Sequence, residues 1–415
     1  MSHGARILEQ CNELGAISDD AQVLTRRYLT PEHRRAATHI AGWMRTAGMA
    51  VDIDALGNVV GRYAAARDDA PLLITGSHMD TVVNAGRYDG TFGILCAIAA
   101  VADLDARQLR LPCAVEVVAF GDEEGVRFGF SMVGSKALSG QFDPALLGKT
   151  DVDGITLREA ITAFGGDVAA IPSLSRAGAN VSAFVEVHIE QGPVLLDESL
   201  ALGVVTSIAG STRIAARVTG VAGHAGTVPM GARRDALAAA AEMALHVETH
   251  AAGHADTLVG TVGRFGVVGG GAINVIPGDV EFTIDVRAAD DATRIAAVVN
   301  LERDCRAVAA RRDVTLDWQT LLELAATPCD PRLQQRLAAS VAAQGIEPRF
   351  LRSGAGHDAM EMARIAPIGM LFVRCGAGGI SHNPRETMTA EDASVATRAL
   401  IHFLEHFDGD PTATV

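Results

Sequence analysis

Four short apolar segments, each followed by polar residues that can bind metals, limit most strongly what this 415-residue chain can fold into. They lie at residues 72–74, 115–120, 184–187 and 370–373. Their length and apolar content are typical of buried strands. Because open α/β sheets collect ligands at the carboxyl ends of their strands, the sequence predicts an α/β fold with a site at one sheet edge.

The first of these segments leads into His78, Asp80 and Asp89, and an apolar helix is expected just after Asp89. His78 is a natural metal ligand, and Asp89 could be a second ligand that bridges two ions. Asp80 could hold the other ring nitrogen of His78 and fix its tautomer. Taken alone, a His-x-Asp sequence fits a hydrogen-bonded structural histidine at a strand end equally well.

The other three strand ends add further ligand types. Asp122, Glu123 and Glu124 directly follow the second strand, and this like-charge crowding must be offset by a cation or by shifted pKa values. His188 ends the third strand, and a glycine-rich loop joins the fourth to His382. Five nitrogen and oxygen ligands suit a site for two divalent ions. They are His78, Asp89, Glu124, His188 and His382.

In the middle of the chain the pattern of predicted strands and helices changes. Between residues 213 and 319 the pattern predicts strand, helix, two strands, helix and strand, the order of a ferredoxin-like sandwich. We therefore expect a catalytic domain over residues 1–212 and 328–415, with a lid or dimerisation domain inserted over residues 213–327. The length alone favours more than one core.

Composition narrows the class of protein. The formal net charge of −15 speaks against binding to nucleic acid or to anionic membranes. No apolar run reaches the roughly 18 residues that span a bilayer, and the N-terminal residues lack the apolar core of a signal peptide. The six cysteines form no C-x-x-C pair, which indicates reduced thiols and a cytoplasmic protein.

Two other enzyme classes lack their residues. Residues 354–359 formally fit the pattern G-x-G-x-x-A, but the acid expected about 20 residues later in a dinucleotide site is absent. No G-x-S-x-G elbow is present, so a serine hydrolase would lack its nucleophile.

With these motifs in place, the chain closely resembles the M20-type binuclear metallohydrolases, and within them the carbamoylase branch. That branch contains allantoate amidohydrolases, N-carbamoyl-L-amino-acid hydrolases and β-ureidopropionase-like enzymes. The resemblance is carried by Gly76-Ser-His-Met-Asp-Thr, Tyr88-Asp-Gly, Asp122-Glu-Glu-Gly-Val-Arg-Phe, His188-Ile-Glu-Gln-Gly-Pro, Gly223-His-Ala-Gly-Thr-Val-Pro-Met, Ile273-Asn-Val-Ile-Pro-Gly, Ser353-Gly-Ala-Gly-His-Asp-Ala and Ile380-Ser-His-Asn-Pro-Arg-Glu.

The resemblance implies a zinc-peptidase-like mixed-sheet catalytic domain. In that arrangement His78, Asp89 and His188 hold one metal, while Asp89, Glu124 and His382 hold the other. The expected cofactors are two divalent ions per subunit, Zn²⁺ first and Mn²⁺ as the alternative. Glu123 would be the general base, with Asp80 and His224 as further catalytic residues.

The resemblance also implies a substrate pocket and a homodimer. His224 would reach the neighbouring subunit's site and donate a hydrogen bond to the developing oxyanion. The fork of Arg287 suits a substrate carboxylate. The implied pocket residues are Gln191, His224, Asn274, Arg287, Gly354, Ala355 and Gly356.

The expected activity is cleavage of the ureido group of a small carboxylate. Allantoate, releasing ammonia and carbon dioxide, is the first expectation, and an N-carbamoyl-L-amino-acid hydrolase or β-ureidopropionase is the alternative. A non-catalytic metal- or ligand-binding protein is the alternative of a different class. The Glu123-Glu124 pair speaks against it, because a binding module needs no uncoordinated base.

Overall fold

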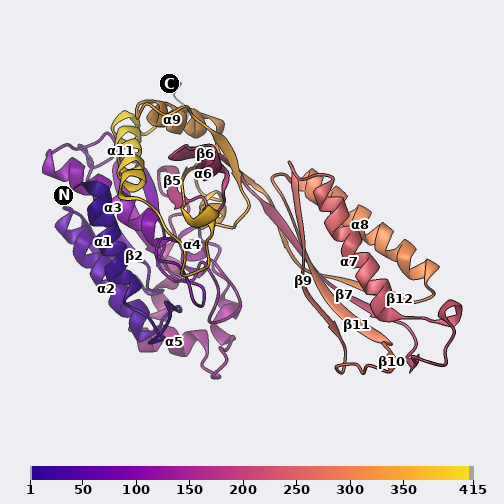
Figure 1. Ribbon diagram of the computed structural model, residues 1–415. Coiled ribbons are helices and arrows are strands. Elements are labelled where there is room, and N and C mark those ends of the chain that lie inside the picture. Colours follow the sequence, from indigo (N-terminus) through magenta and orange to yellow (C-terminus); the bar gives the residue numbers. More distant parts are fainter. Residues whose placement is uncertain (1, 411–415) are drawn as a thin grey trace. The chain divides into compact units, whose positions relative to one another are not determined.

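The computed structural model describes residues 2–410, which form two compact units (Figure 1). Of these described residues, the first unit contains 2–206, Cys329–Leu351 and 355–410. The second contains Ser207–Pro328 and Arg352–Gly354. The inserted domain expected over residues 213–327 falls within the second unit.

The largest sheet has nine strands, in the order β1-β2-β4-β3-β5-β15-β6-β13, with β14 also paired to β6. Its central strands β4, β3, β5 and β15 run parallel, so their carboxyl ends share one edge. The bounds are β1 (Ala50–Ile53), β2 (Val59–Tyr63), β3 (Leu72–His78), β4 (Ala114–Phe120), β5 (Val181–Ile189), β6 (Leu202–Ile208), β13 (Thr327–Pro328), β14 (Phe350–Ser353) and β15 (Ile368–Val373).

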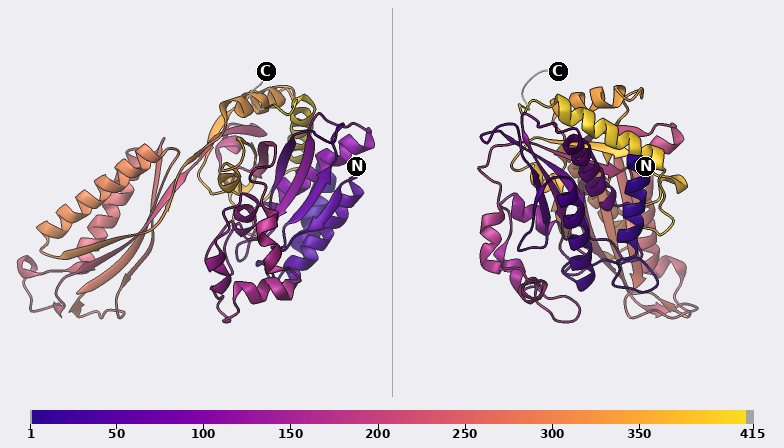
Figure 2. Two further views of the ribbon diagram at one scale, coloured as in Figure 1. Left: turned by 180° about the vertical axis from the view of Figure 1, so that it is seen from behind. Right: turned by 90° about the vertical axis from the view of Figure 1, so that its left-hand side faces the viewer.

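Helices from both ends of the chain pack together over the sheet of the first unit. Contacts join α1 (His3–Gly15) to α3 (Thr91–Ala106) and α11 (Ala390–His406), and α3 packs on β3 and β5. In the right-hand view of Figure 2, these indigo and yellow helices lie side by side in front of the strands. Because α3 is covered by the sheet and by other helices, eleven of its sixteen residues are buried, and all of these except Thr91 are apolar or glycine.

Two further helices of the first unit pack against its sheet: the buried stripe of α2 packs on β1 and β2, and α9 packs on β15 and α11. Thr30 caps α2 by accepting a hydrogen bond from the His33 N–H, and Pro31 occupies its first turn. The bounds are α2 (Pro31–Thr46), α4 (Val133–Leu138), α5 (Leu157–Phe164), α6 (Val194–Asp197), α9 (Pro331–Ala342) and α10 (Ala359–Met362), with 3₁₀ turns η1 (Pro144–Gly148), η2 (Val168–Leu174) and η4 (Ala377–Gly379).

The second unit is a four-stranded antiparallel sheet in the order β12-β7-β11-β9, with two helices packed on it. The chain order βαββαβ is the predicted one. Along β11 every second residue is buried, from Val280 to Ala288. The bounds are β7 (Gly210–Thr219), α7 (Ala236–Ala252), β9 (Leu258–Val267), β11 (Asp279–Ala288), α8 (Asp291–Arg311) and β12 (Thr315–Leu324), with β8 (Gly223–His224), η3 (Met230–Ala232) and β10 (Val275–Ile276) beside them.

The predicted α/β fold class is confirmed. The strands expected at residues 258–262 and 314–318 extend to Val267 and Leu324, because antiparallel pairing continues past the end of the apolar pattern. Among residues 2–410, no helix combines the length and apolarity needed to cross a membrane.

Alanine substitutions at two helical glycines should change the stability of the protein in opposite directions. A Cβ at Gly4 would lie 1.8 Å from the Ala390 carbonyl oxygen where α1 meets α11, whereas a Cβ at Gly42 of α2 would meet nothing within 4 Å. Gly4→Ala should therefore lower the free energy of unfolding by about 1–3 kcal/mol through overpacking. Gly42→Ala should raise it by up to about 1 kcal/mol, since alanine is the better helix former. Urea unfolding followed by circular dichroism measures both, and equal effects would contradict this packing.

Candidate metal centre

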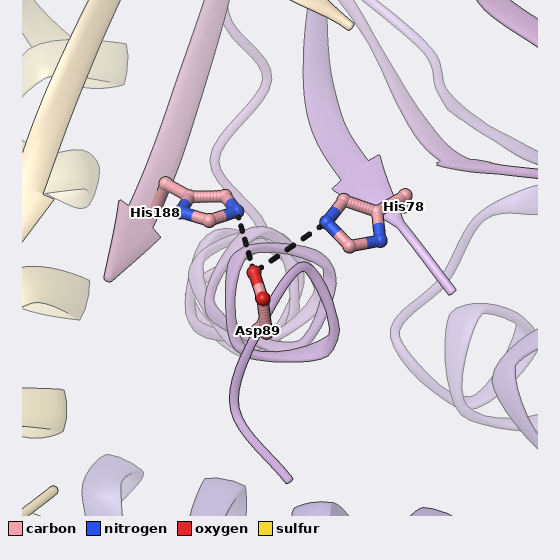
Figure 3. A group of neighbouring side chains, drawn as sticks. All are labelled: His78, Asp89 and His188. Atoms are coloured by element: carbon pink, nitrogen blue, oxygen red, sulfur yellow. Dashed lines mark ion pairs between the residues drawn. The ribbon is translucent and has the colours of Figure 1, made fainter. Parts of the chain in front are cut away.

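Asp89 lies at the centre of the candidate site, between side chains from two neighbouring parallel strands. His78 ends β3 and His188 is the penultimate residue of β5. Their Nε2 atoms lie 3.6 and 3.3 Å from Asp89 Oδ1 (Figure 3). All three side chains are at most 5 % exposed.

The tautomers of the two rings follow from their other nitrogens. His78 Nδ1 lies 3.1 Å from the Asp80 carbonyl oxygen, and His188 Nδ1 lies 2.9 Å from the Ile189 carbonyl oxygen. A carbonyl only accepts, so both Nδ1 atoms carry protons, and in the neutral form of each ring the Nε2 lone pair is directed at Asp89. His188 Nε2 and Asp89 Oδ1 are buried without a hydrogen-bond partner. With both rings neutral, three acceptors converge here with no hydrogen between them.

The second oxygen of Asp89 faces another group of possible ligands. His382 Nε2 lies 3.1 Å from Asp89 Oδ2 and 3.4 Å from Glu124 Oε1. Ligand atoms of Asp89, Glu124 and His382 are mutually within 4.8 Å, as are those of His78, Asp89 and His188. The five residues predicted to bind metal therefore gather in two groups that share Asp89.

The charges of this cluster also call for a cation. Burial acts to raise the pKa of Asp89, but the imidazoles of His188, His382 and His78 outweigh it and hold that pKa well below its usual range. Asp89 and Glu124 raise the pKa of His382 to about 10. Positive charge at this position therefore stabilises the carboxylates. Protonated imidazoles supply such charge, and a divalent ion bound to neutral imidazoles would supply it in their place. The donor set of histidine nitrogens and carboxylate oxygens fits Zn²⁺ or Mn²⁺.

Asp80 differs in detail from its predicted role. The His78 Nδ1 proton goes to the main-chain carbonyl of Asp80, and the Asp80 carboxylate lies 3.8 Å from that nitrogen. The two carboxylate oxygens instead accept hydrogen bonds from the main-chain N–H groups of Glu123 and Glu124, at 3.0 and 3.1 Å. Asp80 thus fixes the acidic turn after β4 against the end of β3.

Glu123 lies next to the metal-ligand candidates, and its side chain is buried. One of its carboxylate oxygens is within 4.8 Å of ligand atoms of His78 and Glu124. Burial raises the pKa of Glu123 well above its usual value, the positive charge of His78 opposes this, and Glu124 reinforces it. The position before it, Asp122, has a left-handed φ of 63°, which turns the chain sharply at the strand end.

Gly90 leaves room for His78. A Cβ at Gly90 would lie 2.5 Å from three atoms of the His78 ring, and Gly90 has a φ of 62°, which favours glycine. The short Asp89-Gly90 turn therefore brings the start of α3 directly under the imidazole.

Gln191, predicted to bind substrate, contacts the group of candidate metal ligands. Its Nε2 donates to Asp89 Oδ2 at 3.0 Å and lies 3.3 Å from Ser381 Oγ. Ser381 Oγ also lies 2.8 Å from Glu386 Oε2. The sequence analysis assigned no role to Ser381 or Glu386. Their position beside His382 in one motif is the only signal that could have identified them.

A further buried group lies against His188. The rings of His188 and His357 are 4.6 Å apart edge to face, and Glu186 Oε1 accepts a hydrogen bond from Ser77 Oγ at 2.7 Å. Burial raises the pKa of Glu186 and lowers that of His357. Neither residue has a role in the interpretation of the sequence, although His357 lies within one of the motifs that carry the family resemblance.

His224 and Asn274 lie together in the second unit. His224 ends β8 and Asn274 directly precedes β10, which pairs with β8 in a small antiparallel ladder, and the Ala225 N–H donates to the Asn274 carbonyl oxygen at 2.9 Å. The Gly226 N–H donates to His224 Nδ1 at 3.0 Å, which leaves Nε2 as the protonated nitrogen of the neutral ring. Both side chains are exposed. His224 therefore offers a hydrogen-bond donor to a ligand.

The guanidinium of Arg287 already forms hydrogen bonds, including two to Asp285 of the same strand. Its Nε and Nη2 donate to the two carboxylate oxygens of Asp285 at 3.1 and 3.0 Å, and its Nη1 donates to the Gly354 carbonyl oxygen at 2.9 Å. Arg287 lies on the face of β11 opposite the buried residues. Gly354 belongs to the second unit, whereas Ala355 and Gly356 belong to the first.

Comparisons with known proteins identify the family and relatives along nearly the whole chain. Residues 74–406 match the family described as peptidase family M20/M25/M40. The chain is 41 % identical to a probable allantoate deiminase of Oryza sativa subsp. japonica, over 97 % of this chain and 88 % of the relative. It is 40 % identical to an N-carbamoyl-L-amino acid amidohydrolase of Geobacillus stearothermophilus, over 97 % and 98 %.

A solved structure shows the same fold. The crystal structure of a hydantoinase/carbamoylase family amidase from Burkholderia multivorans superposes with a TM-score of 0.90 at 34 % identity, covering 97 % of each chain. These relatives confirm the expected class of enzyme, a hydrolase that acts on C–N bonds. The chain belongs to the M20/M25/M40 peptidase family, whose members are metal-dependent, and its relatives place it with the allantoate and N-carbamoyl amino acid amidohydrolases.

Proposed function

We propose that this protein is a binuclear metal-dependent amidohydrolase that cleaves the ureido group of a small carboxylate, with allantoate as substrate and ammonia and carbon dioxide as products. The observation that carries the proposal is the convergence of His78, His188 and His382 on the two oxygens of Asp89. The alternative substrate is an N-carbamoyl-L-amino acid, because a relative of that name is equally similar to this chain.

We assign His78, Asp89 and His188 to one ion and Asp89, Glu124 and His382 to the other, with Zn²⁺ as the first choice and Mn²⁺ as the alternative. Divalent ions supply Lewis-acid chemistry, which makes a ureido carbonyl a better electrophile and a water molecule a better acid. Glu123 takes the proton of the attacking water and passes it to the leaving nitrogen. Asp80 holds the main chain of Glu123 in place for this transfer.

The substrate contacts are assigned by the family resemblance. Arg287 binds the substrate carboxylate, and His224 donates from Nε2 to the developing oxyanion. Gln191, Asn274 and the 354–356 loop complete the assigned pocket. Gln191 also orients Asp89 through its hydrogen bond to Oδ2.

We propose a homodimer formed through the second unit. Large apolar side chains are exposed on α7 and on β9, an edge strand of its sheet. Leu245 is 61 % exposed, Val259 57 % and Phe265 39 %. Unpaired edge strands with apolar side chains favour pairing with another chain. All six cysteines are buried free thiols, which supports a cytoplasmic location.

Ammonia release with added Zn²⁺ or Mn²⁺ tests the proposed reaction and its base together. The wild-type protein should release ammonia from allantoate faster than from N-carbamoyl-L-amino acids; the reverse order would favour the alternative substrate. Glu123→Gln should keep the bound metal, measured by elemental analysis, but lower kcat by about 10²- to 10⁴-fold because the base is lost. Glu13→Gln, on the exposed face of α1, is the control. Normal turnover by the Glu123 variant would rule out this role.

Mixed dimers test whether His224 serves the partner's site. His224→Ala and Glu123→Gln should each be nearly inactive alone. Equal random mixing should restore about a quarter of wild-type activity, since half of the dimers are mixed and each mixed dimer has one intact site. The ammonia assay on chains unfolded and refolded together measures this. Absence of recovery in dimers shown to be mixed would mean that each site uses its own His224.

Replacing Arg287 tests recognition of the carboxylate. Lysine cannot bind Asp285 through two nitrogens and also bind Gly354 and a ligand, so Arg287→Lys should raise KM for carboxylate substrates by about ten- to a hundredfold. The corresponding control is Arg264→Lys on exposed β9. Steady-state kinetics separate KM from kcat. An unchanged KM would remove Arg287 from carboxylate binding.

A further inference from the structure

Glu386 joins two loops that the proposed metal centre depends on. Its Oε1 accepts hydrogen bonds from the main-chain N–H groups of Tyr88 and Asp89, at 2.8 and 3.2 Å. Its Oε2 accepts a hydrogen bond from Ser381 Oγ at 2.8 Å. Asp89 is the shared ligand candidate, and Ser381 directly precedes His382. One carboxylate therefore connects segments that are almost 300 residues apart in the chain.

The surrounding residues pack closely around the Glu386 side chain. Glu386 is only 4 % exposed. A Cβ at the buried Gly86 would lie 2.3 Å from the Glu386 carboxyl carbon and 2.5 Å from its Cβ. The chain therefore comes this close to the carboxylate only because residue 86 has no side chain.

The partners of this carboxylate are unusual for a buried charge. Its hydrogen bonds come from two main-chain N–H groups and a hydroxyl, not from an arginine or lysine. A buried carboxylate is costly unless its oxygens are well satisfied. Both oxygens have donors here, and those donors belong to the two loops that present Asp89 and His382.

We infer that Glu386 is a positioning residue that sets the distance between Asp89 and His382, so that both can share one cation. The inference rests on the proposed ligand roles of these two residues. Asp89 and His382 come from different loops, and His382 is half exposed, with a side-chain exposure of 51 %. The loop before His382 is held through Ser381, whose Oγ lies 2.8 Å from Glu386 Oε2, 3.2 Å from Asp89 Oδ2 and 3.3 Å from Gln191 Nε2. Of these three partners, Glu386 alone also binds the main chain of the Asp89 loop. Partners of metal ligands typically contribute ten- to a hundredfold to metal affinity.

Two substitutions distinguish the effect of the length of the Glu386 side chain from the effect of its charge. Glu386→Gln keeps the length: its amide oxygen can accept from both N–H groups, and its NH₂ can donate to Ser381 Oγ. Glu386→Asp keeps the charge but is one methylene too short to reach both loops. If Glu386 acts by positioning, the glutamine variant should resemble wild type and the aspartate variant should be defective.

The test is retention of metal by the purified full-length protein. Each variant is loaded with Zn²⁺, and its affinity is measured by competition with a chromogenic chelator. Glu386→Asp and Glu386→Ala should bind Zn²⁺ about ten- to a hundredfold more weakly than wild type, and Glu386→Gln should stay close to wild type. Glu391→Ala, five residues on and exposed, should have no effect. Gly86→Ala should reproduce the defect by displacing the carboxylate.

The outcomes distinguish this inference from the proposed function. If wild type itself takes up no Zn²⁺ or Mn²⁺, the proposed metal centre is wrong. If wild type binds Zn²⁺ and Glu386→Asp binds it equally well, the positioning role is wrong. A Glu386→Gln variant as defective as the aspartate variant would also overturn it, since charge rather than reach would then matter. Melting temperatures of the metal-free proteins identify any variant that is simply unfolded, and Gly86→Ala and Glu386→Gln then decide the question.

Discussion

The proposed metal centre depends on one electrostatic arrangement: with neutral imidazoles, acceptors face each other across Asp89 with no proton between them. The carbonyls of Asp80 and Ile189 take the Nδ1 protons of His78 and His188. The Nε2 lone pairs of both rings therefore point at a carboxylate oxygen. Buried acceptors in this arrangement repel one another unless a cation lies between them. The same main-chain hydrogen bonds that hold the rings in place thus determine what the site can bind.

The sheet explains how residues so far apart in the sequence meet. Strands β4, β3, β5 and β15 are parallel neighbours, so the residues that end them leave the sheet at one edge. The strands are buried and rigid, and the ligands sit at their ends or in the loops that follow. This places the acidic turn after β4 next to His78, where the Asp80 carboxylate anchors its main chain.

Several side chains near the proposed metal centre hold other residues in place through hydrogen bonds. Gln191 donates to Asp89, and Glu386 connects the Asp89 loop to Ser381. In the second unit, Asp285 occupies the side of the Arg287 guanidinium that carries Nε and Nη2. A carboxylate ligand of Arg287 would therefore meet a guanidinium that Asp285 and Gly354 already hold in one orientation.

The sequence by itself determined the fold class, the βαββαβ order of the second unit and the residues that gather around Asp89. It could do so because buried parallel strands have a recognisable apolar pattern and because their carboxyl ends must share an edge. The sequence analysis did not anticipate β6, α5 or α11, which it did not assign to any element. Only the tertiary structure decided that the Asp80 carboxylate binds the turn after β4, that Gln191 contacts Asp89 and that Glu386 reaches Tyr88. Those contacts join residues distant in the chain, and hydrogen-bond partners of that kind leave no periodic pattern in the sequence.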